Sequence, residues 1–323
     1  MSGIISVLSN TTNLLKELQR VLPLLTFSQV INPEIDTNLK QSKVIVADFD
    51  LIGPHLYNLP NVQWIQGTWA GTDALMPFIN KSDPPKFPIS RFSGDAFGAL
   101  MGEYVLANVI NYERDFFKVK DNQREQMWST DGKISDYRAI GDMTFGILGL
   151  GNIGSRIGKI LQGLGGTIYG YGRKPTIDKN EYDFVEQYFT KSTLPCLLKS
   201  CDYIINVMPK TNDTTDLLSG DILKNCLDKQ TVFINIGRGN IISEESLIKA
   251  LKENWIQAAI LDVFEGEPLS KKSELWNLPN VFITPHVSGQ SRAKDIAVQF
   301  KKNLEQFENN KTIPNIIDFQ KGY

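Results

Sequence analysis

The sequence predicts an α/β protein of two domains, each built on a parallel sheet covered by helices. Three observations support this class. The chain has 323 residues, more than one ordinary core accommodates. Short apolar runs alternate with helical patterns in two stretches, one in the first hundred residues and one from residue 144 to about residue 285. The second stretch also opens with a glycine-rich turn between a strand and a helix.

The first stretch contains four apolar runs that are typical of buried strands. They cover residues 4–8, 24–27, 44–47 and 62–65. Between the first two runs, apolar residues from Leu14 to Leu22 fall on one face of a helix. Because strands and helices alternate, we expect a parallel sheet with helical crossovers.

A long helical pattern over residues 96–117 is expected to connect the domains, and the second stretch follows it. Its predicted strands cover residues 145–148, 167–171, 203–207, 232–236, 258–261 and 281–283. The last forty residues predict a helix over 293–309 and a tail, too small to fold alone. We therefore expect a first, substrate-binding domain of residues 1–102 completed by 288–323, and a dinucleotide-binding domain of residues 103–287.

The composition excludes several classes of partner. A net charge of -2 gives no basic surface for nucleic acid or an anionic membrane. No apolar run approaches the roughly 20 residues that cross a bilayer, and residues 1–8 lack the basic start of a signal peptide. The three cysteines lie in or beside apolar runs and lack the pairing of a zinc site, so we expect buried thiols, no metal and a cytoplasmic location.

Residues 144–158 (TFGILGLGNIGSRIG) predict a dinucleotide site of the Rossmann type. In this pattern Gly149 permits the tight turn, Gly151 lets backbone approach a pyrophosphate, and Gly154 lets the helix pack close to the sheet. The helix starting at Asn152 and Ile153 then presents N–H groups and a positive dipole end to the phosphates. A glycine pattern alone is weak, but here it has the strand before it and the helix after it.

The end of the next strand bears on the choice of cofactor. An NAD site usually has an acidic residue there for the ribose hydroxyls, but this sequence has Gly172, followed by Arg173 and Lys174. An arginine binds a phosphate through two parallel hydrogen bonds. We therefore expect NADP(H) as the preferred cofactor, with NAD(H) possible. The alternative is that both cations belong to a solvated turn.

Three later strands are each followed by a residue suited to acid–base or anion chemistry. Arg238 follows the strand 232–236, Glu267 follows 258–261 and His286 follows 281–283. Ligands of open parallel sheets gather at the carboxyl ends of strands, so these residues are expected to meet. The other histidine, His55, lies in a Gly-Pro-His turn and is expected on the surface.

The blocks around these residues resemble the D-2-hydroxyacid dehydrogenase family. They are NIGRG at 235–239, LDVFEGEPL at 261–269 and LPNVFITPH at 278–286, and the resemblance extends from about Trp64 to the end of the chain. The resemblance implies a Rossmann-type domain with a flavodoxin-like substrate domain. The Arg–Glu and Glu–His spacings, and the run YGRKP at 171–175, are similar to those of its NADPH-using glyoxylate/hydroxypyruvate reductases.

The resemblance implies reduction of a small 2-oxo acid to the D-2-hydroxy acid. His286 would protonate the oxygen as an alkoxide forms, and an imidazole suits this because its ordinary pKa is about 6.5. Glu267 would orient the imidazole, and Arg238 would hold the substrate carboxylate and polarise its carbonyl.

Four further roles are implied by the same resemblance. Backbone N–H groups of Ala70 and Gly71 would bind the substrate carboxylate, and Asp262 would contact the nicotinamide. Residues 103–137 resemble the segment that forms a homodimer contact in relatives. The two domains would enclose the substrate.

Three alternatives stay open. The substrate could be a larger or aromatic 2-oxo acid, because Trp64, Trp69, Trp128 and Trp276 could line a wide pocket. Formate dehydrogenase shares the fold but has glutamine where Glu267 stands, and phosphoglycerate dehydrogenases often carry an extra domain. A dinucleotide-sensing co-repressor could keep the same three residues without turnover.

Overall fold

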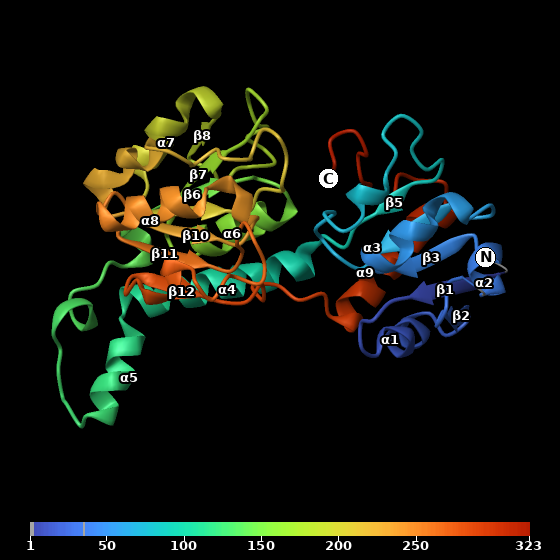
Figure 1. Ribbon diagram of the computed structural model, residues 1–323, viewed down its shortest axis with the longest axis horizontal. Coiled ribbons are helices and arrows are strands. Elements are labelled where there is room, and N and C mark those ends of the chain that lie inside the picture. The colour runs from blue at the N-terminus through green and yellow to red at the C-terminus, as the bar shows by residue number, and fades with distance from the viewer. Residues whose placement is uncertain (1–2, 35) are drawn as a thin grey trace. The chain divides into compact units, whose positions relative to one another are not determined.

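The computed structural model describes residues 3–34 and 36–323, and the chain divides into two compact units (Figure 1). Unit 1 is Met1–Phe97 with Gln290–Tyr323, and unit 2 is Gly98–Gly289. Within the described residues each unit holds one parallel sheet. The predicted α/β class with two parallel sheets is confirmed.

The described part of unit 2 contains a seven-stranded sheet in the order β12-β11-β10-β9-β6-β7-β8. From β6 the chain builds outward through β7 and β8, then returns to β6 and builds in the other direction from β9 to β12. This reversal is the Rossmann topology, and it places a switch point between β6 and β9, where ligands of such sheets bind. The strands are β6 (Thr144–Leu148), β7 (Thr167–Tyr171), β8 (Gln187–Phe189), β9 (Tyr203–Asn206), β10 (Val232–Asn235), β11 (Ala258–Leu261) and β12 (Val281–Ile283).

Helices cover both faces of this sheet because its strands are apolar on both sides. On β9, Ile204 belongs to a core with the helices α7 (Leu194–Ser200) and α8 (Glu244–Lys252). The next side chain back, Tyr203, points to the other face and reaches α4 (Asp95–Glu113). On that face α4 packs against α6 (Asn152–Gln162), where a Cβ added to Gly102 would lie 2.3 Å from Ile160.

Unit 1 contains, among its described residues, a five-stranded sheet in the order β2-β1-β3-β4-β5. This 2-1-3-4-5 order is that of flavodoxin-like folds. The strands are β1 (Ile4–Leu8), β2 (Thr26–Gln29), β3 (Val44–Ala47), β4 (Trp64–Gly67) and β5 (Ile89–Ser90). On one face lie α2 (Thr37–Gln41) and α3 (Phe49–Ile52), whose Leu39, Phe49 and Ile52 join the core.

The other face of this sheet is covered by α1 (Leu14–Val21) and by the C-terminal helix α9 (Ala293–Glu308). Phe300 of α9 stacks on Trp64 of β4 with ring centroids 5.4 Å apart. Asn303 of α9 donates to Gln66 inside the core, at 2.8 Å. The chain therefore returns to unit 1 to complete it. No helix in residues 3–34 or 36–323 combines the length and the apolar character that a membrane crossing needs.

Several local predictions were wrong in detail. The helix expected over 96–117 is interrupted, because Asp115 adopts a left-handed backbone (φ 47°) and caps a separate helix, α5 (Phe116–Arg124). The strands expected at 24–27 and 62–65 begin two residues later, at Thr26 and Trp64. The short strands β5 and β8 were not predicted. Cys196 is exposed, whereas Cys201 and Cys226 are buried as expected.

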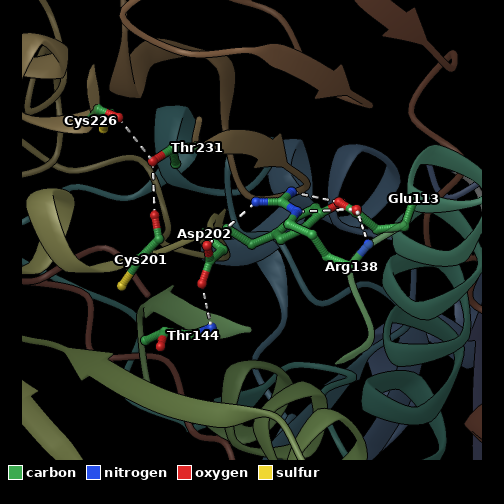
Figure 2. A network of polar contacts seen from close by, with 8 residues as sticks. Glu113, Arg138, Thr144, Cys201, Asp202, Cys226 and Thr231 are labelled. Carbon is green, nitrogen blue, oxygen red and sulfur yellow. Dashed lines mark hydrogen bonds and ion pairs between the residues drawn. The ribbon is translucent and has the colours of Figure 1, made fainter. Parts of the chain in front are cut away.

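A network of ion pairs and hydrogen bonds lies at the amino-terminal edge of the unit 2 sheet (Figure 2). The guanidinium of Arg138 donates to both carboxylate oxygens of Glu113, at the end of α4, at 2.5 and 3.1 Å. It also reaches Asp202 at 3.4 Å, and Asp202 accepts from the backbone N–H of Thr144 where β6 begins. The Tyr203 hydroxyl donates to Glu113 at 2.6 Å. The network ties α4 to the starts of β6 and β9.

Titration of Glu113 makes this network sensitive to pH. Burial raises the pKa of its carboxyl, but the hydrogen bonds from Arg138 and Tyr203 outweigh burial and hold the pKa below its ordinary value. A carboxyl whose pKa is lower in the folded state stabilises the fold above its unfolded pKa of about 4.3. That contribution is lost as the pH falls through the folded value.

We expect Arg138→Met to lower the free energy of unfolding by roughly 2–3 kcal/mol at pH 7, because the carboxylate of Glu113 stays buried without its cation. Urea denaturation measures this. The difference from the wild type should shrink below about pH 4, where a protonated Glu113 no longer needs a cation.

The matched control is Arg124→Met on α5. Arg124 pairs with Asp121 at 2.9 Å, but its side chain is 71% exposed. Its replacement should change stability by less than about 1 kcal/mol. Equal losses in the two variants would mean that the Arg138 network contributes no more than a surface ion pair.

Candidate functional site

Three neighbouring strands of unit 2 end at the same level of the sheet. In the parallel register, Asn235 of β10 lies beside Leu261 of β11, and Leu261 lies beside Ile283 of β12. The segments that follow these strands carry Arg238, Glu267 and His286. The sheet therefore brings the three predicted residues to adjacent positions on its carboxyl edge.

Glu267 and His286 form a direct pair. The imidazole Nδ1 of His286 lies 2.7 Å from Oε2 of Glu267. The second oxygen, Oε1, accepts from the backbone N–H of Phe264 at 3.0 Å. Because a carboxylate only accepts, the proton of this pair sits on Nδ1, and Nε2 is the nitrogen that remains to exchange a proton with a ligand. The His286 side chain is half exposed.

Asp262, which follows β11 directly, anchors the segment that carries His286. It is fully buried, and its backbone carbonyl accepts from the N–H of His286 at 2.9 Å. Its carboxylate accepts from the N–H groups of Val287 and Ser288 at 2.8 and 2.9 Å. His286 has a left-handed backbone (φ 55°), which is uncommon for residues other than glycine. These bonds hold that conformation.

Arg238 lies between two buried glycines, Gly237 and Gly239, in the turn after β10. A Cβ at Gly239 would lie 1.8 Å from the backbone of Phe264, so the turns after β10 and β11 are in contact. The carbonyl of Arg238 accepts from the side chain of Asn235, which in turn accepts from Asn206 of β9 at 2.8 Å. The arginine is thus held by the ends of three strands, with its side chain half-buried.

The glycine turn has the geometry that a pyrophosphate site needs. Gly149 has φ 105°, which opens the tight turn after β6. A Cβ at Gly154 would lie 2.0 Å from the carbonyl oxygen of Gly149, so α6 packs on the turn itself. Among the described atoms, none lies within 4 Å of a Cβ placed on Gly151, the residue that caps α6. Asn152 and Ile153 form the first turn of α6, so these residues fit a dinucleotide.

The end of β7 places Gly172 close to Tyr188 of β8. A Cβ at Gly172 would lie 2.5 Å from the hydroxyl of Tyr188 on β8, so any side chain at this position displaces the tyrosine. Arg173 and Lys174 follow in an exposed turn on the same carboxyl edge as Gly149. Two cations are therefore accessible at the place where an NAD site has its acid.

The predicted substrate loop lies in unit 1, directly after β4. In the described chain, no acceptor binds the N–H groups of Ala70 and Gly71. Arg91, which was not predicted, donates to the carbonyl of Ala70 at 3.3 Å. The loop is anchored at its start by Thr68, whose hydroxyl donates at 2.5 Å to the buried Asp48. Arg91 follows the two-residue strand β5, and so short a strand leaves no sequence pattern from which this arginine could be predicted.

The four tryptophans named above lie in different local surroundings. Trp64 is buried in the core of unit 1, where its Nε1 donates to Ser90 at 3.0 Å. Trp128 is fully exposed, and Trp276 donates to the carbonyl of Ser270 at 2.9 Å. Trp69, edge-on to Phe49, is the one next to the Ala70 loop. His55, expected on the surface, is partly buried, 3.9 Å from Glu34.

Comparison with known proteins identifies relatives over the whole chain. The family model "D-isomer specific 2-hydroxyacid dehydrogenase, NAD binding domain" matches residues 106–288, more than half of the chain. A glyoxylate/hydroxypyruvate reductase A of Enterobacter sp. (strain 638) is 28% identical over 275 residues, which cover 82% of this chain and 85% of that protein.

Two solved structures of this kind have the same fold. A D-isomer specific 2-hydroxyacid dehydrogenase family protein from Aeromonas salmonicida is 27% identical, with a TM-score of 0.84 over 99% of this chain and 100% of that one. A D-isomer specific 2-hydroxyacid dehydrogenase from Xanthobacter autotrophicus Py2, in complex with NADPH and MES, is 26% identical, with a TM-score of 0.85 over 100% of both chains.

Substitution of two glycines of the turn should distinguish a role in packing from a role in ligand binding. We expect Gly154→Ala to cost roughly 1–3 kcal/mol or more of folding stability, because its Cβ meets backbone that cannot move aside. Gly151→Ala should keep stability within about 1 kcal/mol, yet weaken dinucleotide binding, because its methyl group stands where a pyrophosphate approaches. Thermal unfolding and fluorescence titration with NADPH measure the two effects. A Gly151→Ala variant with wild-type affinity would exclude this turn as the phosphate site.

Proposed function

This chain belongs to the D-isomer specific 2-hydroxyacid dehydrogenase family of NAD(P)-dependent oxidoreductases, and we propose that it is an NADPH-preferring reductase of small 2-oxo acids of the glyoxylate/hydroxypyruvate type. The observation that carries the proposal is the Glu267–His286 pair at 2.7 Å, two strands from Arg238 on one sheet edge. An acid–base group and an anion-binding cation are what this reaction requires.

In this proposal His286 protonates the substrate oxygen through Nε2. Glu267 accepts from Nδ1, which orients the ring and leaves Nε2 for the substrate oxygen. The N–H of Phe264 holds Glu267 in place. These two hydrogen bonds set the orientation of the imidazole, and the transferred proton leaves from Nε2 on the other side of the ring.

Arg238 binds the substrate carboxylate and polarises the carbonyl next to it. Its guanidinium donates to the carbonyl of Gly237 at 2.7 Å, which fixes where the side chain leaves the turn. A held carboxylate presents one face of the carbonyl, so one enantiomer is formed, and the family indicates the D-hydroxy acid. The bound nicotinamide supplies the hydride.

We propose NADPH as the preferred cofactor, with NADH possible. Gly149, Gly151, Asn152, Ile153 and Gly154 would hold the pyrophosphate. Arg173 and Lys174 would bind the 2′-phosphate, and Gly172 leaves no acid beside them to repel it. The similar protein from Xanthobacter autotrophicus was solved with NADPH.

We assign unit 2 as the dinucleotide-binding domain and unit 1 as the substrate-binding domain, with the N–H groups of Ala70 and Gly71 as donors to the substrate carboxylate. We also propose a homodimer formed through residues 103–137. Figure 1 shows α5 and the loop after it extending away from the sheet of unit 2. Large apolar side chains are exposed on this part of the chain: Phe116, Phe117, Val119, Met127 and Trp128. The cytoplasmic location predicted from the sequence stays a prediction.

The test of the proposed function is oxidation of NADPH and of NADH, followed at about 340 nm, with glyoxylate, hydroxypyruvate, pyruvate and phenylpyruvate in parallel. We expect the highest kcat/KM with NADPH and one of the first two acids. A preference for phenylpyruvate would replace the small-acid substrate with an aromatic one. No turnover of any pair would contradict the proposal and favour a dinucleotide-sensing binding protein.

Replacing the proposed acid tests its role. We expect His286→Asn to lower kcat by roughly 10²–10⁴-fold with NADPH affinity unchanged. Asparagine is chosen because it tolerates the left-handed backbone at this position. His55→Asn, at the other histidine, is the matched control and should keep wild-type kinetics. If His286→Asn kept its kcat, another group would have to supply the proton.

Arg173→Ala tests the cofactor assignment. Loss of the guanidinium should raise the KM for NADPH by at least about tenfold, the effect of one charge-assisted bidentate contact, and should leave the KM for NADH nearly unchanged. Arg156→Ala, on α6, is the control for a general loss of positive charge. Equal losses for the two cofactors would mean that Arg173 does not contact the 2′-phosphate.

A further inference from the structure

We propose that Tyr104 and Thr284 are positioning residues that act through Asp262 to hold His286 in its working orientation. The inference rests on the proposed function, in which His286 is the acid. It adds two residues, one of them on α4, that do not touch substrate or cofactor in the mechanism given above.

The three side chains form a hydrogen-bond chain with a fixed direction. Oγ1 of Thr284 lies 2.5 Å from Oδ1 of Asp262, and Oη of Tyr104 lies 2.7 Å from the same Oγ1. A carboxylate only accepts, so the threonine hydroxyl donates to Asp262. That hydroxyl has one proton, so it must accept from Tyr104. The chain runs from the tyrosine to the threonine to the aspartate.

Within residues 3–34 and 36–323, every donor to the Asp262 carboxylate comes from the segment that brackets His286. Thr284 lies two residues before the histidine, while Val287 and Ser288 follow it and donate through their N–H groups. The segment is therefore wrapped around one buried negative charge. Since His286 has a left-handed backbone, which is strained for this residue, its conformation depends on how firmly the two flanks are held.

Removing the hydroxyl of Thr284 would disturb both ends of the chain. Asp262 would lose one of the three donors described above, and the hydroxyl of Tyr104 would lose its acceptor in a partly buried position. Burial raises the pKa of Tyr104 to about 12, with the charge of Asp262 adding to the effect. The tyrosine therefore stays protonated, and remains a donor, at any pH used for assay.

Helix α4 holds the segment at a second point. The hydroxyl of Ser288 donates to the sulfur of Met101 at 3.4 Å, one turn before Tyr104 on the same helix. Thus α4 contacts the segment on both sides of His286, at Thr284 and at Ser288. These two contacts let α4 fix the position of the turn that carries His286.

The test uses Thr284→Val, which keeps the shape and removes the hydroxyl, with Thr284→Ser, which keeps the hydroxyl, and Tyr104→Phe. The control is Tyr112→Phe, which removes a hydroxyl from the same helix outside this hydrogen-bond chain. We expect Thr284→Val to lower kcat by roughly 10–100-fold, because small misplacements of a reacting group have effects of this size. The NADPH dissociation constant should not change. Thr284→Ser should restore most of kcat, Tyr104→Phe should fall between them, and Tyr112→Phe should match the wild type.

A second readout needs neither cofactor nor turnover. The chain has two histidines, so selective ¹⁵N labelling of histidine gives two sets of ring signals, which His55→Asn assigns. We expect the Nδ1–H signal of His286, bonded to Glu267, to shift or broaden in Thr284→Val and Tyr104→Phe. It should return in Thr284→Ser. The His55 signals should stay in place throughout.

Wild-type kcat and wild-type His286 signals in both Thr284→Val and Tyr104→Phe would overturn the inference. So would a loss shared equally by Tyr112→Phe, since that would indicate a general loosening of α4. Failure of the proposed function is distinct from either result. In that case the wild type turns over none of the 2-oxo acids, and the ring signals alone decide whether the chain of hydroxyls positions His286.

Discussion

The site of unit 2 depends on the in-step pairing of β10, β11 and β12, which ends these strands at one level of the sheet. A shift of one residue in either pairing would turn the side chains of a strand to the opposite face. Because β10 and β11 are buried along their whole length and β12 is partly buried, such a shift would disrupt the packing of the side chains on both faces, so the register is firmly held. The distance between Nδ1 of His286 and Glu267 is therefore a product of sheet packing, refined by the turns that follow.

The two edges of this sheet carry different kinds of polar group. At the carboxyl edge, carboxylate, imidazole and guanidinium groups stay partly exposed, and glycines keep room for a ligand. At the amino edge, the Arg138 guanidinium and the Glu113 carboxylate are satisfied by one another and hold α4 on the sheet. Helix α4 contributes to both edges, through Tyr104 and Glu113. The ion pair that stabilises the fold and the residues of the proposed site thus lie at opposite ends of the strands. Helix α4 contacts both groups.

Local patterns in the sequence were sufficient for the class of fold, for both sheets and for which strand end carries each of Arg238, Glu267 and His286. These features depend on runs of a few residues and on the rule that parallel strands share a carboxyl edge. The break at Asp115 was not foreseen, because a single left-handed residue leaves the helical pattern on either side intact. The Tyr104–Thr284 bond joins residues 180 positions apart. Such a bond follows from tertiary packing, which a single sequence does not disclose.

The uneven burial of the cysteines has a practical consequence. Burial raises the pKa of the Cys226 thiol to about 12 and that of Cys201 further still, so neither forms the reactive thiolate readily. Cys196, on α7, is exposed. A maleimide dye should therefore attach to the native chain at this one position without any mutation. Since α7 lies against the face of the sheet and the proposed chemistry lies at its edge, the dye would report on assembly or diffusion of an enzyme that carries no substitution.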